Sequence, residues 1–250
     1  MAILHTESLT KEFGKLRAVD DVSYELEAGE LASIIGPNGA GKTTFFNLLS
    51  GEFAPTSGEI YLKGENVTGL SPHEMVRRGL GRVFQISNYF PELTVYENVR
   101  ICVQARLQNE RGGFDLFTKA TTDDEIIDIT HQILERTELT QLAEKEANEI
   151  AHGDKRRLEL GMAIGRNPDV LLLDEPMGGL AKEEVSEIQD FILELNEEYT
   201  IVLVEHKVDV VKELSDRITV LHQGSVLADG TVEEIENNRE VQHVYLREDV

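Results

Sequence analysis

Residues 36–44, GPNGAGKTT, combine glycines with a lysine and two threonines in a pattern that could hold phosphate. Two glycines separated by four residues let backbone N–H groups curl around phosphate oxygens, and the following helix adds its positive N-terminal end. Lys42 would reach the β- and γ-phosphates, and the Thr43 hydroxyl would ligate Mg²⁺. A glycine-rich turn with an incidental lysine is the alternative. The predicted phosphate and nucleotide contacts are Gly36, Pro37, Asn38, Gly39, Ala40, Gly41, Lys42, Thr43 and Thr44.

A second candidate is VLLLDEP, residues 170–176, in which four apolar residues precede two acids. The run predicts a buried strand, and open α/β sheets bind ligands at the carboxyl ends of their strands. Asp174 would hold Mg²⁺ through its waters, and Glu175 would polarise an attacking water as general base. The alternative is a strand that merely ends in two solvated acids. The lysine loop argues against it, because a phosphate-binding loop requires acids of this kind nearby to hold the metal.

Two further segments carry polar side chains of interest. His206 lies just beyond the apolar run of IVLVEH, where it could hydrogen-bond a γ-phosphate or serve only a structural role. Gly153 lies between His152 and Asp154, ahead of a basic segment with helical spacing. Taken alone, these residues allow a metal site, an ordinary helix start, or a turn that holds an anion on a helix N-terminus.

Hydrophobic periodicity predicts the elements that position these motifs. Residues 1–30 alternate apolar and polar side chains as half-buried strands do, and 57–67 predict a strand pair. Residues 86–165 show helical runs instead, interrupted by a polar, glycine-containing loop at 108–122. After residue 165 buried strands and an amphipathic helix return, followed by a hairpin at Gly224. An α/β core interrupted by helices is the simplest architecture.

Together the motifs resemble the nucleotide-binding subunits of ABC transporters, from about Leu4 to Leu246. The resemblance implies an α/β P-loop NTPase of ABC type, a single domain over residues 1–250. Its mixed sheet core and antiparallel β subdomain would occupy about 1–85 and 166–250, and a helical subdomain about 86–165. Gln85 matches the glutamine loop, which senses the metal and the transmembrane partner. Phe13 matches the aromatic residue that stacks on adenine, with a core phenylalanine as the alternative.

By this resemblance IAHGDKRR occupies the family's signature position, usually Leu-Ser-Gly-Gly-Gln. Gly153 keeps the glycine whose N–H faces phosphate at a helix N-terminus. Ala151 lacks the serine hydroxyl that contacts the γ-phosphate, and His152 and Asp154 replace Gly and Gln. Residues 151–154 would therefore contact the ATP of a partner subunit, and the metal interpretation of this turn is the weaker one. Residues 177–184, MGGLAKEE, match the family's loop that crosses the dimer interface, the crossing loop. This loop also departs from the family pattern, with an alanine at 181 where Asp or Asn is common.

With these departures, the signature sequence is similar to that of the ATPases of branched-chain amino acid importers and of related urea and amide importers. The resemblance implies ATP and Mg²⁺, a second ATPase subunit that is either identical or a paralogue, permease subunits, and indirectly an extracytoplasmic solute-binding protein. The surface near Gln85, with Tyr89 and Phe90, is a candidate docking groove for a permease helix, unless these aromatics are buried. A soluble ABC-type ATPase in a non-transport process, such as cofactor or cluster assembly, is the alternative function.

The chain has a formal net charge of −23, which argues against nonspecific binding to nucleic acid. Cys102 is the only cysteine, so an internal disulfide is excluded and a buried thiol is expected. No stretch approaches the roughly 18 apolar residues of a membrane span, and the N-terminus lacks a signal-peptide pattern. We therefore expect a cytoplasmic protein, peripheral on the inner face of the cell membrane.

The acidic residues recur along the whole chain, which suggests a halophilic host whose salty cytoplasm screens their mutual repulsion. If so, the free energy of unfolding and the ATPase activity should both rise with KCl concentration. Denaturation and turnover measured across a KCl series test this hypothesis. Full activity and stability at low salt would contradict it.

Overall fold

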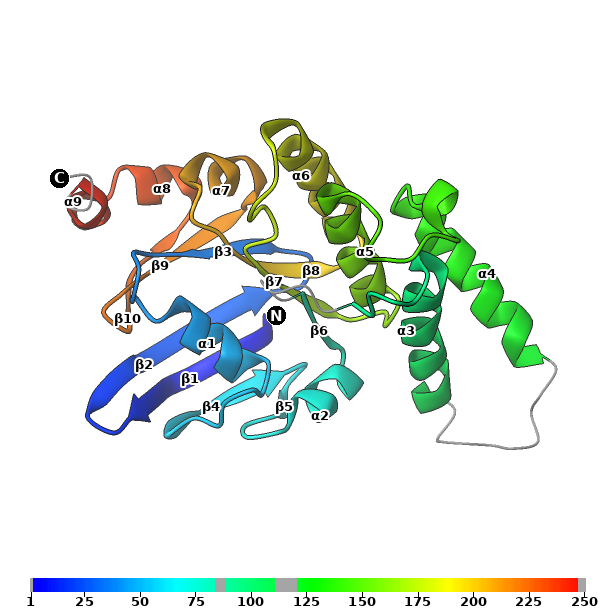
Figure 1. Ribbon diagram of the computed structural model, residues 1–250. Helices are drawn as coiled ribbons and strands as arrows, with labels where there is room; N and C mark the ends of the chain where they lie inside the picture. The colour runs from blue at the N-terminus through cyan, green and yellow to red at the C-terminus, as the bar shows by residue number, and fades with distance from the viewer. Residues whose placement is uncertain (1, 84–88, 111–120, 247–250) are drawn as a thin grey trace.

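The computed structural model describes residues 2–83, 89–110 and 121–246 (Figure 1). Its larger sheet has six strands in the order β10-β9-β3-β8-β7-β6. The strands β9, β3, β8, β7 and β6 run parallel to one another, whereas β10 pairs antiparallel with β9. The six strands are Leu31–Ile35 (β3), Leu80–Val83 (β6), Val170–Asp174 (β7), Thr200–Val204 (β8), Arg217–His222 (β9) and Ser225–Gly230 (β10).

A second, antiparallel sheet has the order β2-β1-β4-β5. Its strands are Ala2–Phe13 (β1), Leu16–Glu27 (β2), Ser57–Leu62 (β4) and Glu65–Asn66 (β5). Val22, Tyr24 and Leu26 are all buried, as the alternation in the sequence predicts. Helix α1, Lys42–Leu49, adds Phe45 and Phe46 to one core with residues of both sheets, and α2, Pro72–Arg77, follows β5.

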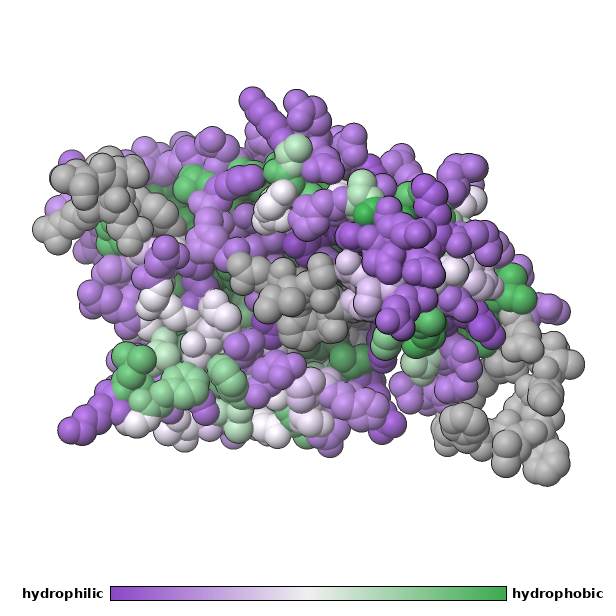
Figure 2. All heavy atoms as spheres, in the orientation of Figure 1, coloured by the Kyte–Doolittle hydropathy of each residue, from purple (hydrophilic) through white to green (hydrophobic). Residues whose placement is uncertain are grey.

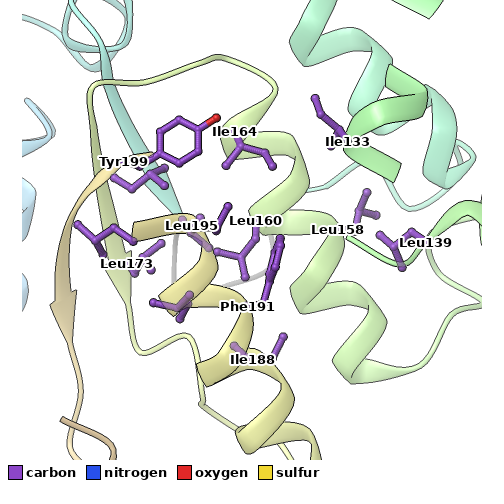
Figure 3. Close-up of a cluster of buried hydrophobic side chains, with 14 of the residues drawn as sticks. Ile133, Leu139, Leu158, Leu160, Ile164, Leu173, Ile188, Phe191, Leu195 and Tyr199 are labelled. Carbon is purple, nitrogen blue, oxygen red and sulfur yellow. The ribbon is translucent and has the colours of Figure 1, made fainter. Parts of the chain in front are cut away.

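Helix α1 and the antiparallel sheet cover one face of the larger sheet. Other helices cover the opposite face and extend beyond the β6 edge (Figure 1). Helices α3, α4, α5 and α6 pack in one apolar cluster with the buried strands β7 and β8, and Val210 and Leu214 of α7 join it; Figure 3 shows part of this cluster. These four helices are Val95–Glu110 (α3), Thr121–Arg136 (α4), His152–Ile164 (α5) and Lys182–Asn196 (α6). The remaining helical elements are Thr140–Leu142 (η1), Val208–Leu214 (α7), Val232–Glu236 (α8) and Arg239–Leu246 (α9).

The predicted apolar helix faces are buried, with Ile126, Ile133 and Leu134 on α4 and Ile188 and Ile192 on α6 in the core. The loop predicted at 108–122 was placed too widely at both ends, because α3 continues to Glu110 and α4 begins at Thr121. Residues 111–120 lie outside the described residues. That the helices form a separate subdomain at about 86–165 stays a prediction.

The surface of the face seen in Figure 2 is mostly hydrophilic, in keeping with the spread of acidic residues along the chain. Cys102 is buried, as expected, at 7% exposed. Among the described helices, none combines the length and the apolar character that crossing a membrane requires.

Candidate nucleotide-binding site

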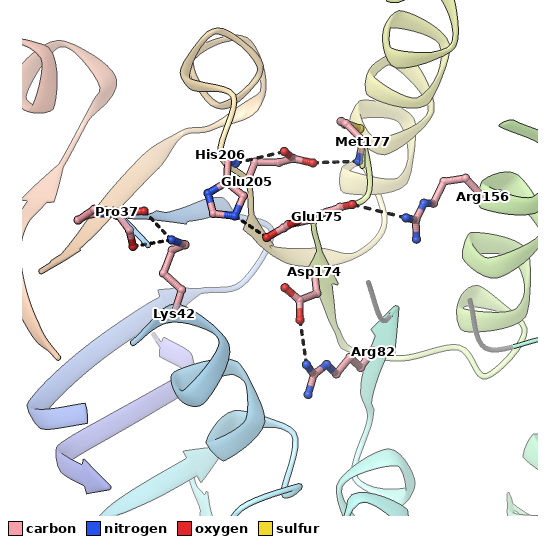
Figure 4. A network of polar contacts seen from close by, with 10 residues as sticks. Pro37, Lys42, Arg82, Arg156, Asp174, Glu175, Met177, Glu205 and His206 are labelled. Atoms are coloured by element: carbon pink, nitrogen blue, oxygen red, sulfur yellow. Dashed lines mark hydrogen bonds and ion pairs between the residues drawn. The ribbon is translucent and has the colours of Figure 1, made fainter. Parts of the chain in front are cut away.

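Three neighbouring parallel strands end at the same edge of the larger sheet. Ile34 on β3 and Asp174 on β7 both pair with Val204 on β8. The chain segments that leave these strands therefore meet, and they carry the lysine loop, the acid pair and His206 (Figure 4). The structure thus brings together motifs that lie far apart in the sequence, at the edge where parallel sheets bind ligands.

The loop between β3 and α1 adopts a backbone that only glycine tolerates at two positions. Gly36 has φ 155° and Gly41 has φ 103°, and a Cβ on either would overlap a backbone carbonyl, that of Leu221 or of Ala18. Lys42 is 6% exposed, and its ammonium donates to the carbonyls of Gly36 at 2.5 Å and Pro37 at 3.1 Å. The cation is therefore held against the loop that would wrap the phosphates.

Asp174 lies at the end of β7 and forms a buried ion pair with Arg82 of β6. Arg82 Nη2 lies 2.9 Å from Asp174 Oδ2, and the side chains are 7% and 6% exposed. Arg82 Nη1 also donates to Asn47 Oδ1 at 2.7 Å and Ser50 Oγ at 2.6 Å, which ties the pair to the end of α1. Burial of this kind is tolerated only when the charges are paired and hydrogen-bonded.

The oxygen donors at this edge fit a hard divalent cation. Thr43 is exposed in the first turn of α1, and Asp174 supplies a carboxylate at the end of β7. Mg²⁺ prefers such oxygen ligands and usually keeps several of its waters. Gln85, the third predicted ligand, lies outside the described residues.

Glu175 and His206 form a close pair at the mouth of the site (Figure 4). His206 Nε2 lies 2.5 Å from Glu175 Oε1, and the side chains are 45% and 19% exposed. Glu175 has φ 50°, a left-handed conformation that costs a non-glycine residue on the order of 1 kcal/mol. The strained turn lets the carboxylate face the histidine and solvent.

The buried Glu205 is a site residue that the sequence did not single out. Its Oε1 accepts from Met177 N at 2.9 Å, and its Oε2 accepts from His206 N at 3.3 Å. Burial raises the pKa of Glu205, although both backbone hydrogen bonds oppose that rise. The carboxylate thereby fixes His206 to the loop that follows Glu175. The only sequence signal is its place between a buried strand and a histidine.

The turn predicted to face a partner's phosphate begins helix α5. Ala151 is the N-cap residue of α5 and makes no side-chain capping bond, and Gly153 is buried in the first turn. Gly153 N donates to Glu184 Oε1 at 3.2 Å, and His152 Nε2 lies 3.5 Å from Gly178 O. No cluster of metal-ligating side chains was found among residues 2–83, 89–110 and 121–246, so the metal interpretation of this turn has no support.

The aromatic residues predicted to make contacts differ in how far they are exposed. Phe13 is 45% exposed and packs edge-on against Phe53, so the alternative of a core phenylalanine is wrong. Phe90 is 51% exposed, whereas Tyr89 is partly buried against the helical core. Of the two aromatics proposed for docking, Phe90 is therefore the more available.

A protein-family model described as ABC transporter matches residues 19–178 of this chain. The chain is also 41% identical over 250 residues to the high-affinity branched-chain amino acid transport ATP-binding protein LivG of Salmonella typhimurium. That match covers 98% of each protein. The similarity thus extends far beyond the short motifs, over almost the whole length of both chains.

Solved structures give a similar result. A nucleotide-free ATP-binding cassette from an ABC transporter superposes with a TM-score of 0.84 at 30% identity, over 98% of this chain and 99% of that one. A dimeric ATP-binding cassette in a post-hydrolysis state, bound to ADP and phosphate, superposes with a TM-score of 0.77 at 27% identity. That match covers 92% of this chain and 98% of the other.

Replacing Arg82 with Met should destabilise the protein by about 3–5 kcal/mol, because it leaves the carboxylate of Asp174 buried without its cation. The free energy of unfolding in urea measures this loss. Arg78→Met is a matched control, since Arg78 pairs with Glu65 on the surface and its loss should cost less than about 1 kcal/mol. Equal effects of the two substitutions would contradict the structural importance of the buried pair.

Proposed function

This chain belongs to the ABC transporter family, and on that premise we propose that it powers an importer of branched-chain amino acids or a related small polar solute. The family and the ABC-type α/β fold predicted from the motifs are confirmed, and the chain is accordingly an ATPase of this type. The solute class is supported by LivG, whose name assigns it to branched-chain amino acid transport. The ATP-driven part of the proposal is carried by the convergence of Lys42, Asp174 and the Glu175–His206 pair at one sheet edge.

In the proposed reaction, the side chains at this edge have distinct roles. Lys42 exchanges its carbonyl partners on the loop for β- and γ-phosphate oxygens of ATP. Glu175 accepts a proton from the attacking water, and His206, which touches it, orients that water against the γ-phosphate. Mg²⁺, held by Thr43, Asp174 and Gln85, would supply charge neutralisation at the phosphate oxygens. Phe13 offers an exposed ring on which adenine can stack.

We propose that the working unit contains two such subunits, either identical or paralogous. The chain has one phosphate loop and one signature turn, and each ATP would lie between the loop of one subunit and the turn of the other. Gly153 N would then face the partner's γ-phosphate, with Ala151, His152 and Asp154 beside it. The similarity to a dimeric cassette supports this arrangement.

A cavity of about 400 Å³ beside β6 is the proposed docking site for a permease helix. Phe90 and Ile101 line it and are exposed, and Val83, which directly precedes the segment that contains Gln85, lines it as well. The cavity combines apolar residues with charged ones such as Glu52 and Arg166, a lining that suits an amphipathic helix. The protein would accordingly lie on the inner face of the cell membrane, and a solute-binding protein would act only through the permease.

Glu175→Gln tests the proposed reaction. Because the amide cannot accept a proton from water, turnover should be nearly abolished while ATP binding persists and an ATP-bound dimer accumulates. Phosphate release, nucleotide titration and size-exclusion chromatography with light scattering measure the three effects. Lys42→Ala is the opposite control and should lose ATP binding and the dimer together. Unchanged turnover in Glu175→Gln would remove the general-base assignment.

Gly153→Asp tests whether the signature turn serves the partner subunit. A carboxylate there would repel the partner's phosphate, so the variant should bind ATP as a monomer yet fail to pair. Gly153→Ala, which adds a Cβ without charge, separates crowding from repulsion. If Gly153→Asp lost ATP binding as a monomer, the turn would belong to the chain's own nucleotide site.

A further inference from the structure

Two helices that border the proposed dimer interface begin without a capping side chain. Ala151 is the N-cap residue of α5, at the signature turn, and Ala181 is the N-cap residue of α6, at the crossing loop. Alanine has no oxygen to accept from the first backbone N–H groups, which ordinarily need such a partner. At α5, a side chain from α6 accepts from one of these N–H groups, that of Gly153.

The carboxylate of Glu184 serves both helix starts. Its Oε1 accepts from Gly153 N at 3.2 Å, and its Oε2 accepts from Ala181 N at 2.8 Å. The carboxylate also rests against the face of Gly153, where a Cβ would lie 2.8 Å from Oε1. An anion of this chain thus occupies the N–H group that the proposed function assigns to the partner's γ-phosphate.

We propose that Glu184 makes subunit pairing depend on the γ-phosphate, because its carboxylate holds Gly153 N until the phosphate of the partner's ATP displaces it. This inference rests on the proposed function, in which Gly153 faces the partner's ATP. A carboxylate and a phosphate repel each other and cannot share one N–H group at close range. ADP lacks the γ-phosphate that replaces the carboxylate, so with ADP the Glu184 contact persists and the pair stays open.

The geometry allows this exchange without disrupting α6. The two carboxylate oxygens bind different N–H groups, so Glu184 can release Gly153 and still hold the N–H of Ala181, the N-cap residue of α6. Glu184 is only half-buried, so the released oxygen can bind water. His152 Nε2, which lies 3.5 Å from Gly178 O, is a second contact between the turn and the crossing loop.

Glu184→Gln in the Glu175→Gln background tests the proposal. The amide keeps the size of the side chain and a carbonyl acceptor but loses the charge that opposes phosphate. We expect the ATP concentration needed for half-maximal dimer to fall by about fivefold or more, and some dimer to form with ADP. ATP affinity of the monomer, measured at protein concentrations below dimerisation, should be unchanged. Light scattering against nucleotide concentration gives the dimer fraction.

Glu183→Gln is the matched control, because it removes the same charge one residue away, at an exposed position. It should leave pairing unchanged. Equal effects of Glu183→Gln and Glu184→Gln, or weaker pairing in Glu184→Gln, would overturn the inference. Absence of ATP-dependent pairing in the Glu175→Gln parent would instead overturn the proposed function, and this inference with it.

A second measurement does not depend on pairing. In the nucleotide-free monomer, the amide of Gly153 should exchange its hydrogen faster in Glu184→Gln than in Glu183→Gln, because its charged acceptor is gone. Unfolding in urea shows whether both variants fold. Identical exchange at Gly153 in the two folded variants would show that Glu184 does not hold this N–H group.

Discussion

The parallel register of β3, β8 and β7 is the constraint on which the site depends. Because Ile34 and Asp174 pair with the same residue of β8, the loops that follow these strands open at one edge of the sheet. Buried charges then fix the loops in place. Arg82 forms an ion pair with Asp174, and Glu205 accepts hydrogen bonds from the backbone N–H groups of Met177 and His206. The pair of Glu175 and His206 therefore lies directly in front of these buried charges, with His206 the more exposed of the two.

The sequence predicted the local parts of this arrangement well. Its motifs and periodicity identify the lysine loop, the strands before Asp174 and His206, and the hairpin at Gly224, because each depends on neighbours in the chain. It could not predict the contacts that brace the site. Arg82 and Asp174 are 92 positions apart, and Met177 and Glu205 are 28 apart, so only the sheet order makes them neighbours.

The two alanines at 151 and 181 illustrate the same limit. In the sequence they are separate departures from a family pattern, each with a missing side-chain oxygen. In the structure they start neighbouring helices, and the single carboxylate of Glu184 binds at both starts. The signature turn and the crossing loop are thus joined by one side chain, that of Glu184.

The most direct test of a site shared between subunits is to mix two inactive proteins. Lys42→Ala lacks a working phosphate loop and Gly153→Asp lacks a working signature turn, but a dimer with one of each has one site with both parts intact. We predict that the mixture hydrolyses ATP although neither protein does so alone. A mixture as inactive as its components would contradict the account.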